Sequence, residues 1–347
     1  MGCTGPKSGI RIFNKYTFLD IIAKQVNYFR QSTNIEIPLL FMNSFNTTQE
    51  TRSILKDKIN YNEFLQHQFP KLTPDYDAFE YSQSPNQEWN PPGHGDIYLS
   101  LYSSGQLESL LERGIEYAFI SNSDNLGASL DPSILGYMVE SKKQFLMETT
   151  AKTLSDIKGG TLVRYDGKLM LLERAQVPEE NIPEFEDIKK FTVFNTNNIW
   201  VNLKVLKEKL EKNNLQLPVI INKKSVAGNP VTQLETAMGA AIGQFENSGS
   251  IIVPRNRFLP VKKTSDLLIL QSDLVDKSNI NELKYHENCI KNGIPKIHFE
   301  GPLTHIENYE KAMKVVPSLK DLIELTVIGD VEFSENQALV GTVTLKS

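Results

Sequence analysis

The sequence predicts an α/β protein with a mixed, mostly parallel sheet and a separate C-terminal region. Short apolar runs alternate with amphipathic helical runs over most of the chain, as in domains whose strands are joined by helices. Asp166-Gly167 lies between two strand-like runs, which is typical of a tight antiparallel hairpin. Apolar-glycine pairs recur at Ile328-Gly329 and Val340-Gly341, a separation of two hexapeptide periods that is typical of a β-helix. An ordinary β-hairpin explains this last pattern nearly as well.

The composition indicates an ordinary globular protein with no nucleic-acid and no membrane partner. The chain has 347 residues, with 37 Lys and Arg against 42 Asp and Glu, a net charge of −5 and 40% hydrophobic residues. This length is enough for two domains with cores of their own. The slight acidity argues against a nucleic-acid coat or a polybasic membrane anchor. No apolar run approaches the roughly 20 residues that a transmembrane helix needs.

The cysteine and histidine content excludes several classes of site. Cys3 and Cys289 are too few for a disulfide framework or a four-ligand zinc site. The five histidines do not show the spacing of a zinc metalloprotease. The N-terminus lacks the apolar segment of a signal peptide. We therefore expect a reducing, cytoplasmic compartment.

Local patterns predict the individual elements and a domain boundary. Thr47 and Glu50 have the spacing of a capping box that opens a helix through Leu55. A boundary after Asp266–Leu270 gives a domain over residues 1–270 and another over residues 271–347. Strands are predicted over Ile35–Asn43, Glu116–Ser121, the two halves of Thr161–Glu173, Phe191–Phe194 and Pro218–Ile221. Helices are predicted around Leu107, Leu110 and Leu111 before Gly114, and over Leu203–Lys212 and Val231–Phe245.

Two glycine-containing segments are candidates for binding phosphate. The N-terminal segment Gly2–Ser8 combines backbone N–H groups near glycines with the ammonium of Lys7, although it is not a Walker A loop. Without other evidence, a flexible tail is the simpler interpretation. In the second segment, prolines and glycines surround His94, and Asp96 can cap a helix that begins near Ile97. A structural turn is the alternative interpretation of this second segment.

Three further polar segments are candidates for ligand contacts. Asn122 and Asp124 follow the strand Glu116–Ser121, where ligands bind in open α/β sheets, and Asp124 suits a hard cation such as Mg²⁺. An Asx turn is the structural alternative. Clustered amides over residues 194–198 and the Gly159-Gly160 pair can grip sugar hydroxyls or simply form loops. The segment from Pro254 to Thr264 carries four cations, which suits phosphate, although a solvated loop is the usual meaning.

Taken in order, these segments resemble the eukaryotic-type UTP–glucose-1-phosphate uridylyltransferases, also called UDP-glucose pyrophosphorylases. The segments that carry the resemblance are MGCTGPKS, PLLFMNSFNTTQET, PPGHGDIYLSLYSSG, FISNSDNLGASLD, ETTAKTLSDIKGGTL, AQVP, FNTNNIWVNL, QLETAMGAAI and VPRNRFLPVKKTSDLL. The resemblance implies a Rossmann-like nucleotidyltransferase domain and a C-terminal left-handed β-helix. It also implies the reaction of UTP with glucose 1-phosphate to UDP-glucose and pyrophosphate, with Mg²⁺ and without a covalent enzyme intermediate.

The resemblance also implies roles for individual residues. Lys7 would contact the triphosphate and assist the leaving pyrophosphate, Lys262 would neutralise the reacting phosphates, and Asp124 would bind Mg²⁺. Four residues would bind the nucleotide: Gln66, which would read the uracil edge, His94, Gly95 and Asn122. Four would hold the glucose: Gly160, Glu173, Asn195 and Asn197.

The family pattern extends beyond the residues that match here. It places a segment L-N-G-G-L-G-T-S and a central strand before the first matching residue, and further β-helix rungs after residues 341–343. We therefore expect a chain truncated at both ends relative to the family, with an incomplete phosphate loop and weak catalysis. The alternatives are a non-catalytic protein that binds nucleotide sugars and a uridylyltransferase for another sugar 1-phosphate. The family also implies homo-oligomers that form through the β-helix.

Overall fold

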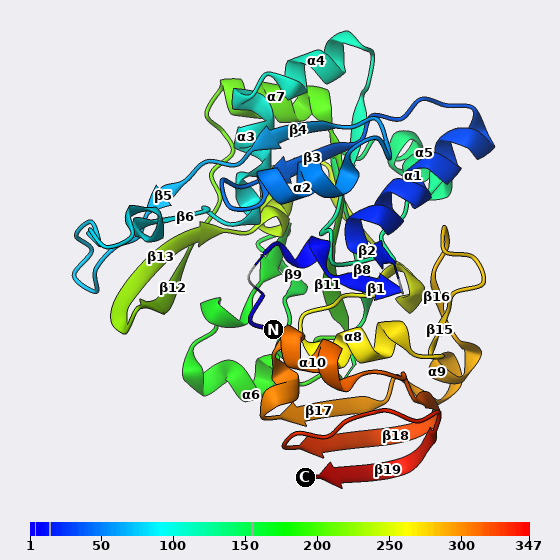
Figure 1. Cartoon of the computed structure of the whole chain (residues 1–347). Coiled ribbons are helices and arrows are strands. Elements are labelled where there is room, and N and C mark those ends of the chain that lie inside the picture. The colour runs from blue at the N-terminus through cyan, green and yellow to red at the C-terminus, as the bar shows by residue number, and fades with distance from the viewer. Residues whose placement is uncertain (4, 14, 154–155) are drawn as a thin grey trace.

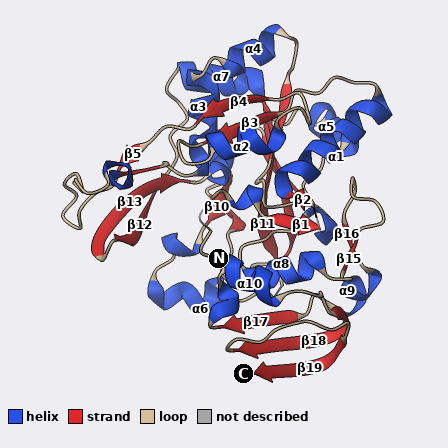
Figure 2. Ribbon diagram, viewed as in Figure 1, coloured by secondary structure: helices blue, strands red, loops and turns tan. Residues whose placement is uncertain are grey.

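The structure, a computed structural model, describes residues 1–3, 5–13, 15–153 and 156–347 (Figure 1). Helices and strands are mixed along the whole chain, and three long strands lie together at the C-terminal end (Figure 2). The α/β class predicted from the sequence is confirmed. Within the described ranges, no helix is long and apolar enough to cross a bilayer.

The N-terminal half of the chain supplies short strands and five of the ten α-helices that the structure describes. Its elements are β1 (Arg11–Phe13), β2 (Tyr16–Thr17), α1 (Phe18–Thr33), β3 (Leu40–Asn43), α2 (Thr48–Leu55), β4 (Asn62–Leu65), β5 (Phe69–Pro70), β6 (Trp89–Asn90), the 3₁₀ helix η3 (His94–Asp96), α3 (Ile97–Ser103), α4 (Gln106–Glu112), β7 (Tyr117–Ile120) and α5 (Pro132–Glu140).

The remaining elements alternate between two hairpins, longer strands and short helices. They are β8 (Phe145–Ala151), β9 (Thr161–Tyr165), β10 (Lys168–Leu172), α6 (Ile182–Phe185), β11 (Val193–Asn202), α7 (Leu203–Glu211), β12 (Val219–Val226), β13 (Asn229–Thr236), the 3₁₀ helix η7 (Met238–Gln244), β14 (Ser248–Ile252), the 3₁₀ helix η8 (Arg255–Arg257), α8 (Thr264–Gln271), β15 (Val275–Asp276), β16 (Lys284–Tyr285), α9 (Glu287–Asn292), β17 (Lys296–Glu300), α10 (Ile306–Ala312), β18 (Ser318–Ile328) and β19 (Ala338–Lys346).

A mixed sheet of order β14-β8-β11-β7 forms the centre of the molecule. Strand β14 is parallel to β8, but β11 returns between β7 and β8 and is antiparallel to both. The sheet is mixed as predicted, whereas the expectation that its pairs are mostly parallel is wrong. The first six residues of β8 are buried, so this strand is covered on both faces. Strands β3 and β4 form a separate parallel pair.

Most of the predicted local elements are present. The Asp-Gly hairpin is confirmed, because Tyr165 pairs with Lys168 and both turn residues have positive φ. The helix before Gly114 and the strand after it are confirmed as α4 and β7. Helix α2 also forms, but the predicted capping box does not, because the Thr47 hydroxyl accepts from the Ser44 N–H instead. The strand predicted from Ile35 is shorter, since β3 begins at Leu40.

The predicted helix over Val231–Phe245 is wrong. Residues up to Thr236 form β13, which pairs with β12 in an antiparallel hairpin. The turn is Ala227-Gly228, where both residues have positive φ. Only the last part of the predicted range is helical, as the buried 3₁₀ helix η7. The β-branched residues Val231 and Thr232 favour a strand, and Gly228 favours a turn. The apolar periodicity of the range suggested a helix instead.

The C-terminal strands are parallel, so the hairpin interpretation of this region is wrong. Strand β17 pairs in parallel with β18, and β18 pairs in parallel with β19. Parallel neighbours need a connection that crosses back, which a tight hairpin cannot provide. Gly329 and Gly341, the glycines of the repeated pattern, have φ of 90° and 69°. Both therefore occupy backbone conformations that favour glycine.

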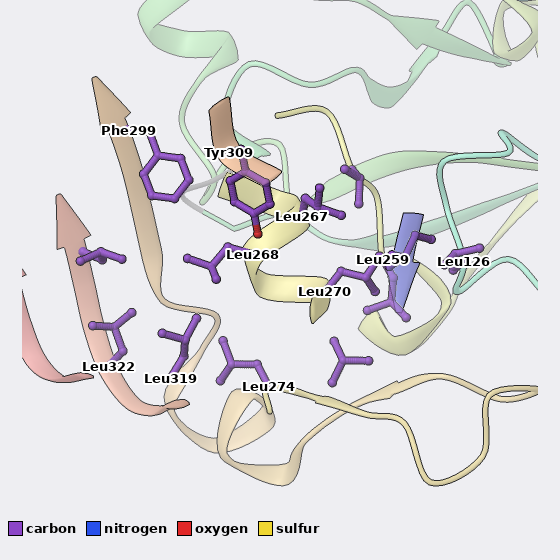
Figure 3. Packing of buried hydrophobic residues seen from close by; sticks show 14 of the residues in the cluster. Leu126, Leu259, Leu267, Leu268, Leu270, Leu274, Phe299, Tyr309, Leu319 and Leu322 are labelled. Carbon is purple, nitrogen blue, oxygen red and sulfur yellow. The ribbon is translucent and has the colours of Figure 1, made fainter. Parts of the chain in front are cut away.

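One hydrophobic cluster joins residues from both sides of position 270 (Figure 3). Leu126 and Leu259 belong to it together with Leu274, Phe299 and Leu319. The N-terminal end of the chain also contacts the C-terminal part, since the Ile306 N–H donates to the Met1 carbonyl oxygen at 2.8 Å. The domain boundary near residue 270 stays a prediction.

Candidate functional site

Two lysines that are far apart in the sequence bind the same carboxylate oxygen. Lys7 Nζ lies 2.6 Å from Oδ2 of Asp124, and Lys262 Nζ lies 2.8 Å from the same atom. Lys7 also donates to the carbonyl oxygen of Val261 at 3.2 Å. The structure therefore brings together the three charged residues to which the sequence assigned the phosphates and the metal.

The two oxygens of the Asp124 carboxylate have different surroundings. Oδ1 is buried and accepts no hydrogen bond within the described residues. Burial raises the pKa of Asp124, but the ammonium groups of Lys262 and Lys7 outweigh burial, and the net pKa is lowered. The carboxylate is therefore ionised at neutral pH, and a buried anionic oxygen without a partner suits a hard cation.

Asn125 fixes the loop that carries Asp124 to the loop that carries Lys262. Its side-chain oxygen accepts from the N–H groups of Gly127 and Leu259, at 3.2 and 2.8 Å. The Val261 N–H donates to the Asp124 carbonyl oxygen at 3.1 Å. These bonds bring Lys262 beside Asp124, and they are long-range contacts that no local pattern predicts.

A buried ion pair between Glu148 and Arg257 packs beside both loops and stabilises them. Glu148, on β8, is completely buried, and Arg257 donates to both of its carboxylate oxygens, at 2.6 and 2.7 Å. The same carboxylate accepts from Asn198 and Trp200 of β11, at 3.0 and 2.8 Å. The sequence reasoning missed Glu148. Its signal was a charge inside an otherwise buried strand, because such a charge requires a partner.

A cavity beside His94 contains two of the expected nucleotide-binding residues. It has a volume of about 430 Å³, and Gln66, His94, Gly93, Lys71 and Trp89 are among its lining residues. Gly95 adjoins His94, whereas Asn122 lies two residues before Asp124 on the loop described above. The four predicted nucleotide residues are therefore divided between the cavity wall and the Asp124 loop.

His94 is held as a neutral imidazole. Its Nδ1 accepts from the Met238 N–H at 3.1 Å, which leaves Nε2 as the proton-bearing nitrogen. His94 is exposed as a whole residue, but burial of its imidazole by the surrounding protein and the nearby Lys262 ammonium lower its pKa to about 4. At neutral pH the ring can therefore donate one hydrogen bond from Nε2 without carrying a charge.

Gly95 allows a close approach of two backbone segments. A Cβ atom at this position would lie 2.5 Å from Thr236 Oγ1 and 2.8 Å from the carbonyl carbon of Thr236. The segment with His94 therefore packs directly on the end of β13. Any larger residue at position 95 would push the two segments apart.

The four expected sugar-binding residues lie together. The Asn195 N–H donates to the Gly160 carbonyl oxygen at 2.9 Å, and the Asn195 amide donates to Oδ1 of Asn197 at 2.8 Å. The Glu173 carboxylate lies so close to Gly160 that a Cβ atom there would be 2.6 Å from Oε1. Burial raises the pKa of Glu173. Carboxylate and amide groups in this arrangement can bind several hydroxyls of one ligand.

Arg255 connects the loop of Lys262 to the segment that leads to Gly160. Its guanidinium donates to both carboxylate oxygens of Asp156, at 2.7 and 3.0 Å. The Gly159 N–H in turn donates to the Asp156 carbonyl oxygen at 2.8 Å. From the sequence, Arg255 was only one of four clustered cations, and Asp156 was not identified.

Comparisons with known proteins show which sequences and structures this chain resembles. The family model described as UTP--glucose-1-phosphate uridylyltransferase matches residues 1–340. A protein of that name from Hordeum vulgare is 45% identical over 351 residues, which cover 99% of this chain and 74% of the relative. Another from Encephalitozoon cuniculi is 44% identical over 346 residues, covering 99% of this chain and 70% of the relative.

Solved structures show the same similarity. A structure described as UDP-glucose phosphorylase from Trypanosoma brucei matches with a TM-score of 0.91 and 42% identity, covering 100% of this chain and 78% of that one. A point mutant of UDP-glucose pyrophosphorylase from Leishmania major, solved in complex with UDP-Glc, matches with a TM-score of 0.89 and 39% identity. This match covers 99% of this chain and 78% of that one.

Proposed function

The chain belongs to the UTP–glucose-1-phosphate uridylyltransferase family, and we propose that the cluster around Asp124 and the cavity beside His94 form its reaction site. The reaction converts UTP and glucose 1-phosphate to UDP-glucose and pyrophosphate. A phosphate oxygen of glucose 1-phosphate attacks the α-phosphorus of UTP. The bond from that phosphorus to the oxygen that bridges to the β-phosphate breaks, and pyrophosphate leaves.

The observation that carries this proposal is the pairing of Lys7 and Lys262 with one oxygen of Asp124. The transition state of such a transfer carries its negative charge on the phosphate oxygens, so catalysis consists mainly of positioning and charge neutralisation. We assign Lys7 to the triphosphate and the leaving pyrophosphate, and Lys262 to the phosphates around the reacting phosphorus. Both ammonium groups are partly exposed and can exchange the carboxylate oxygen for phosphate oxygens.

Asp124 fits a Mg²⁺ ion that is shared with the substrate. Magnesium is commonly held by one or two carboxylates together with substrate phosphates, and it would supply charge neutralisation there. The buried Oδ1 without a partner supports this assignment. The described residues hold no group of three or more His, Cys, Asp or Glu side chains that could bind a metal, which is consistent with phosphate completing the coordination.

The remaining site residues divide between nucleotide and sugar. We assign Gln66 to the uracil edge, His94 and Gly95 to the nucleotide and its phosphate, and Asn122 to the sugar nucleotide. The support is that Gln66 and His94 line one cavity. We assign the glucose to the second group of residues described above, which lie together: Gly160, Glu173, Asn195 and Asn197.

We also propose a Rossmann-like catalytic domain and a C-terminal left-handed β-helix that mediates homo-oligomers. The parallel pairing of β17, β18 and β19 supports the β-helix. A cytoplasmic location is proposed because the two cysteines, Cys3 and Cys289, are both free thiols. Light scattering and cell fractionation test the oligomer and the location.

Release of pyrophosphate from UTP and glucose 1-phosphate with Mg²⁺, together with chromatography of the sugar nucleotide, tests the reaction. We expect UDP-glucose. Parallel assays with galactose 1-phosphate and N-acetylglucosamine 1-phosphate test the sugar, since discrimination among such similar sugars depends on a few contacts. A higher kcat/KM for either alternative would overturn the assignment of glucose, and binding of UDP-glucose without any turnover would indicate a non-catalytic binding protein.

A further inference from the structure

A polar cluster beside the nucleotide cavity has no role in the assignments above. Its centre is the Asp96 carboxylate, which the sequence placed at the start of α3 as a helix cap. Asp96 is nearly buried and makes no capping hydrogen bond to α3. Its two oxygens bind His67 and Ser100 instead.

His67 is bound to Asp96 through both its backbone and its ring. The His67 N–H donates to Oδ2 at 2.7 Å, and Nδ1 lies 2.9 Å from Oδ1. The Ser100 hydroxyl donates to Oδ2. Since a carboxylate only accepts, Nδ1 carries a proton in this arrangement. On the other side of the ring, Nε2 lies 3.3 Å from the Ser103 hydroxyl, which can donate to it.

The contacts between His67 and Asp96 connect the segments of Gln66 and His94, both of which line the cavity. Gln66 directly precedes His67, and its N–H donates to the Asn43 carbonyl oxygen at 2.8 Å. His94 lies two residues before Asp96 in the same 3₁₀ helix. The bonds from His67 to Asp96 therefore hold the end of β4, with Gln66, against the segment that presents His94.

The order Ser103, His67, Asp96 also matches hydroxyl, imidazole and carboxylate in a hydrolytic triad. Ser103, however, is an exposed residue at the end of α3 and is not part of the lining of the cavity. The backbone contact of His67 with Asp96 and the position of Gln66 favour a structural role toward the nucleotide.

We propose that His67 and Asp96 form a positioning pair that sets the distance between Gln66 and His94 and thereby the affinity for the uridine nucleotide. This inference rests on the proposed function. Neither residue contacts substrate in this scheme. The ring bond to Asp96 orients Gln66, whereas the contact with Ser103 contributes nothing to nucleotide binding.

Substituting His67 by Asn or by Gln distinguishes the contact of Nδ1 with Asp96 from the contact of Nε2 with Ser103. His67→Asn places an N–H donor where Nδ1 lies, toward Asp96, whereas His67→Gln extends its amide toward the position of Nε2 and Ser103. We expect His67→Ala and His67→Gln to raise the KM for UTP about tenfold, which corresponds to one lost hydrogen bond to a charged group. The KM for glucose 1-phosphate and kcat should stay within about twofold of wild type.

The KM for UTP should equal that of the wild type in His67→Asn, which keeps a donor toward Asp96, and also in Ser103→Ala. Rescue by glutamine instead of asparagine would overturn the proposal, as would a Ser103→Ala variant that behaves like His67→Ala. Equal KM values for UTP in all variants, or a loss of kcat alone, would also overturn it. Circular dichroism and thermal melting check that each variant is folded.

Amide hydrogen exchange tests the pair without catalysis. In peptides that cover residues 62–68, protection should fall in His67→Ala and His67→Gln and remain in His67→Asn. If the wild type forms no UDP-glucose, the proposed function fails, yet this pattern of exchange would still support the pair. Unchanged exchange in all three variants would overturn the pair even in an active enzyme.

Discussion

Arg257 forms a bidentate ion pair with Glu148, whose side chain is completely buried in the central sheet. The pair lies between strand β8 and the loop that leads to Lys262. A buried carboxylate needs such a partner because removing a charge from water is costly. The position of Lys262, which we propose neutralises the reacting phosphates, is thus connected to an ion pair in the core.

Replacing only one member of this pair should destabilise the fold strongly. For Arg257→Met we expect a loss of about 3–5 kcal/mol in the free energy of unfolding, because the Glu148 charge stays buried without its partner. The double variant Arg257→Met/Glu148→Leu should recover part of the loss. Guanidinium denaturation of the four proteins in this double-mutant cycle measures the coupling, and additive losses would contradict the interpretation.

Removing Lys7 or Lys262 should impair catalysis more than stability. We expect Lys7→Ala and Lys262→Ala each to lower kcat by roughly 100-fold or more, as for the loss of one group that stabilises transition-state charge. Steady-state production of UDP-glucose measures this. Lys263→Ala is the matched control, since Lys263 is the exposed neighbour of Lys262. A similar loss of kcat in the control would show that general surface charge is responsible.

Asp124→Asn should remove the response to Mg²⁺. The carboxylate is ionised because Lys262 and Lys7 lower its pKa, and an amide cannot replace its charge. We expect a kcat at least about 100-fold lower at saturating Mg²⁺. A titration of activity with Mg²⁺ makes the comparison, with the exposed residue Asp75 replaced by Asn as the control. Wild-type magnesium dependence in Asp124→Asn would exclude Asp124 as the ligand.

Gly160→Ala should weaken binding of the sugar phosphate selectively. The new Cβ would lie 2.6 Å from Oε1 of Glu173, so the carboxylate must move. We expect the KM for glucose 1-phosphate to rise and the KM for UTP to stay constant. Gly136→Ala provides the control, because no atom lies within 4 Å of a Cβ there and the position is in helix α5. That control should gain about 0.5–1 kcal/mol of stability in thermal or denaturant unfolding.

His94 should make stability depend on pH below neutrality. Its pKa falls from the ordinary 6.5 to about 4 in the folded protein, so the unfolded chain binds more protons between these values. The contribution of His94 to stability is therefore complete above pH 6.5 and is lost as the pH falls toward 4. The denaturation midpoint of His94→Asn should vary less with pH over this window. An unchanged pH profile would contradict the lowered pKa.

The sequence predicted best those features that depend on neighbouring residues. The hairpin at Asp166-Gly167 follows from the conformation that the turn itself requires, and it forms as predicted. The range from Val231 was assigned to a helix because its apolar spacing was considered without the partner strand β12. Pairing in a sheet is decided by residues that are distant in the sequence.

The same distinction applies to the candidate site. The resemblance identified Lys7, Asp124 and Lys262, and the structure places them together. It did not identify Glu148 or Asp156, whose importance follows from contacts with the loop around Arg255–Arg257. The sequence position of a carboxylate does not show which cation it pairs with, because the two segments come together only in the folded protein.

The hydrogen bond between Ile306 and Met1 connects the N-terminal end of the chain, which leads to the proposed reaction site, to the C-terminal part of the molecule. The segment that ends at Lys7 is anchored to the first residue of α10, whereas Lys262 follows a loop anchored to the central sheet. Helix α8, which begins two residues after Lys262, also contacts α10, because the Tyr309 hydroxyl donates to the side-chain oxygen of Gln271 at 2.6 Å. A displacement of α10 would therefore act on the two ammonium groups by different routes. The distance between the two ammonium groups around Asp124 would then change when a part of the molecule far from Asp124 moves.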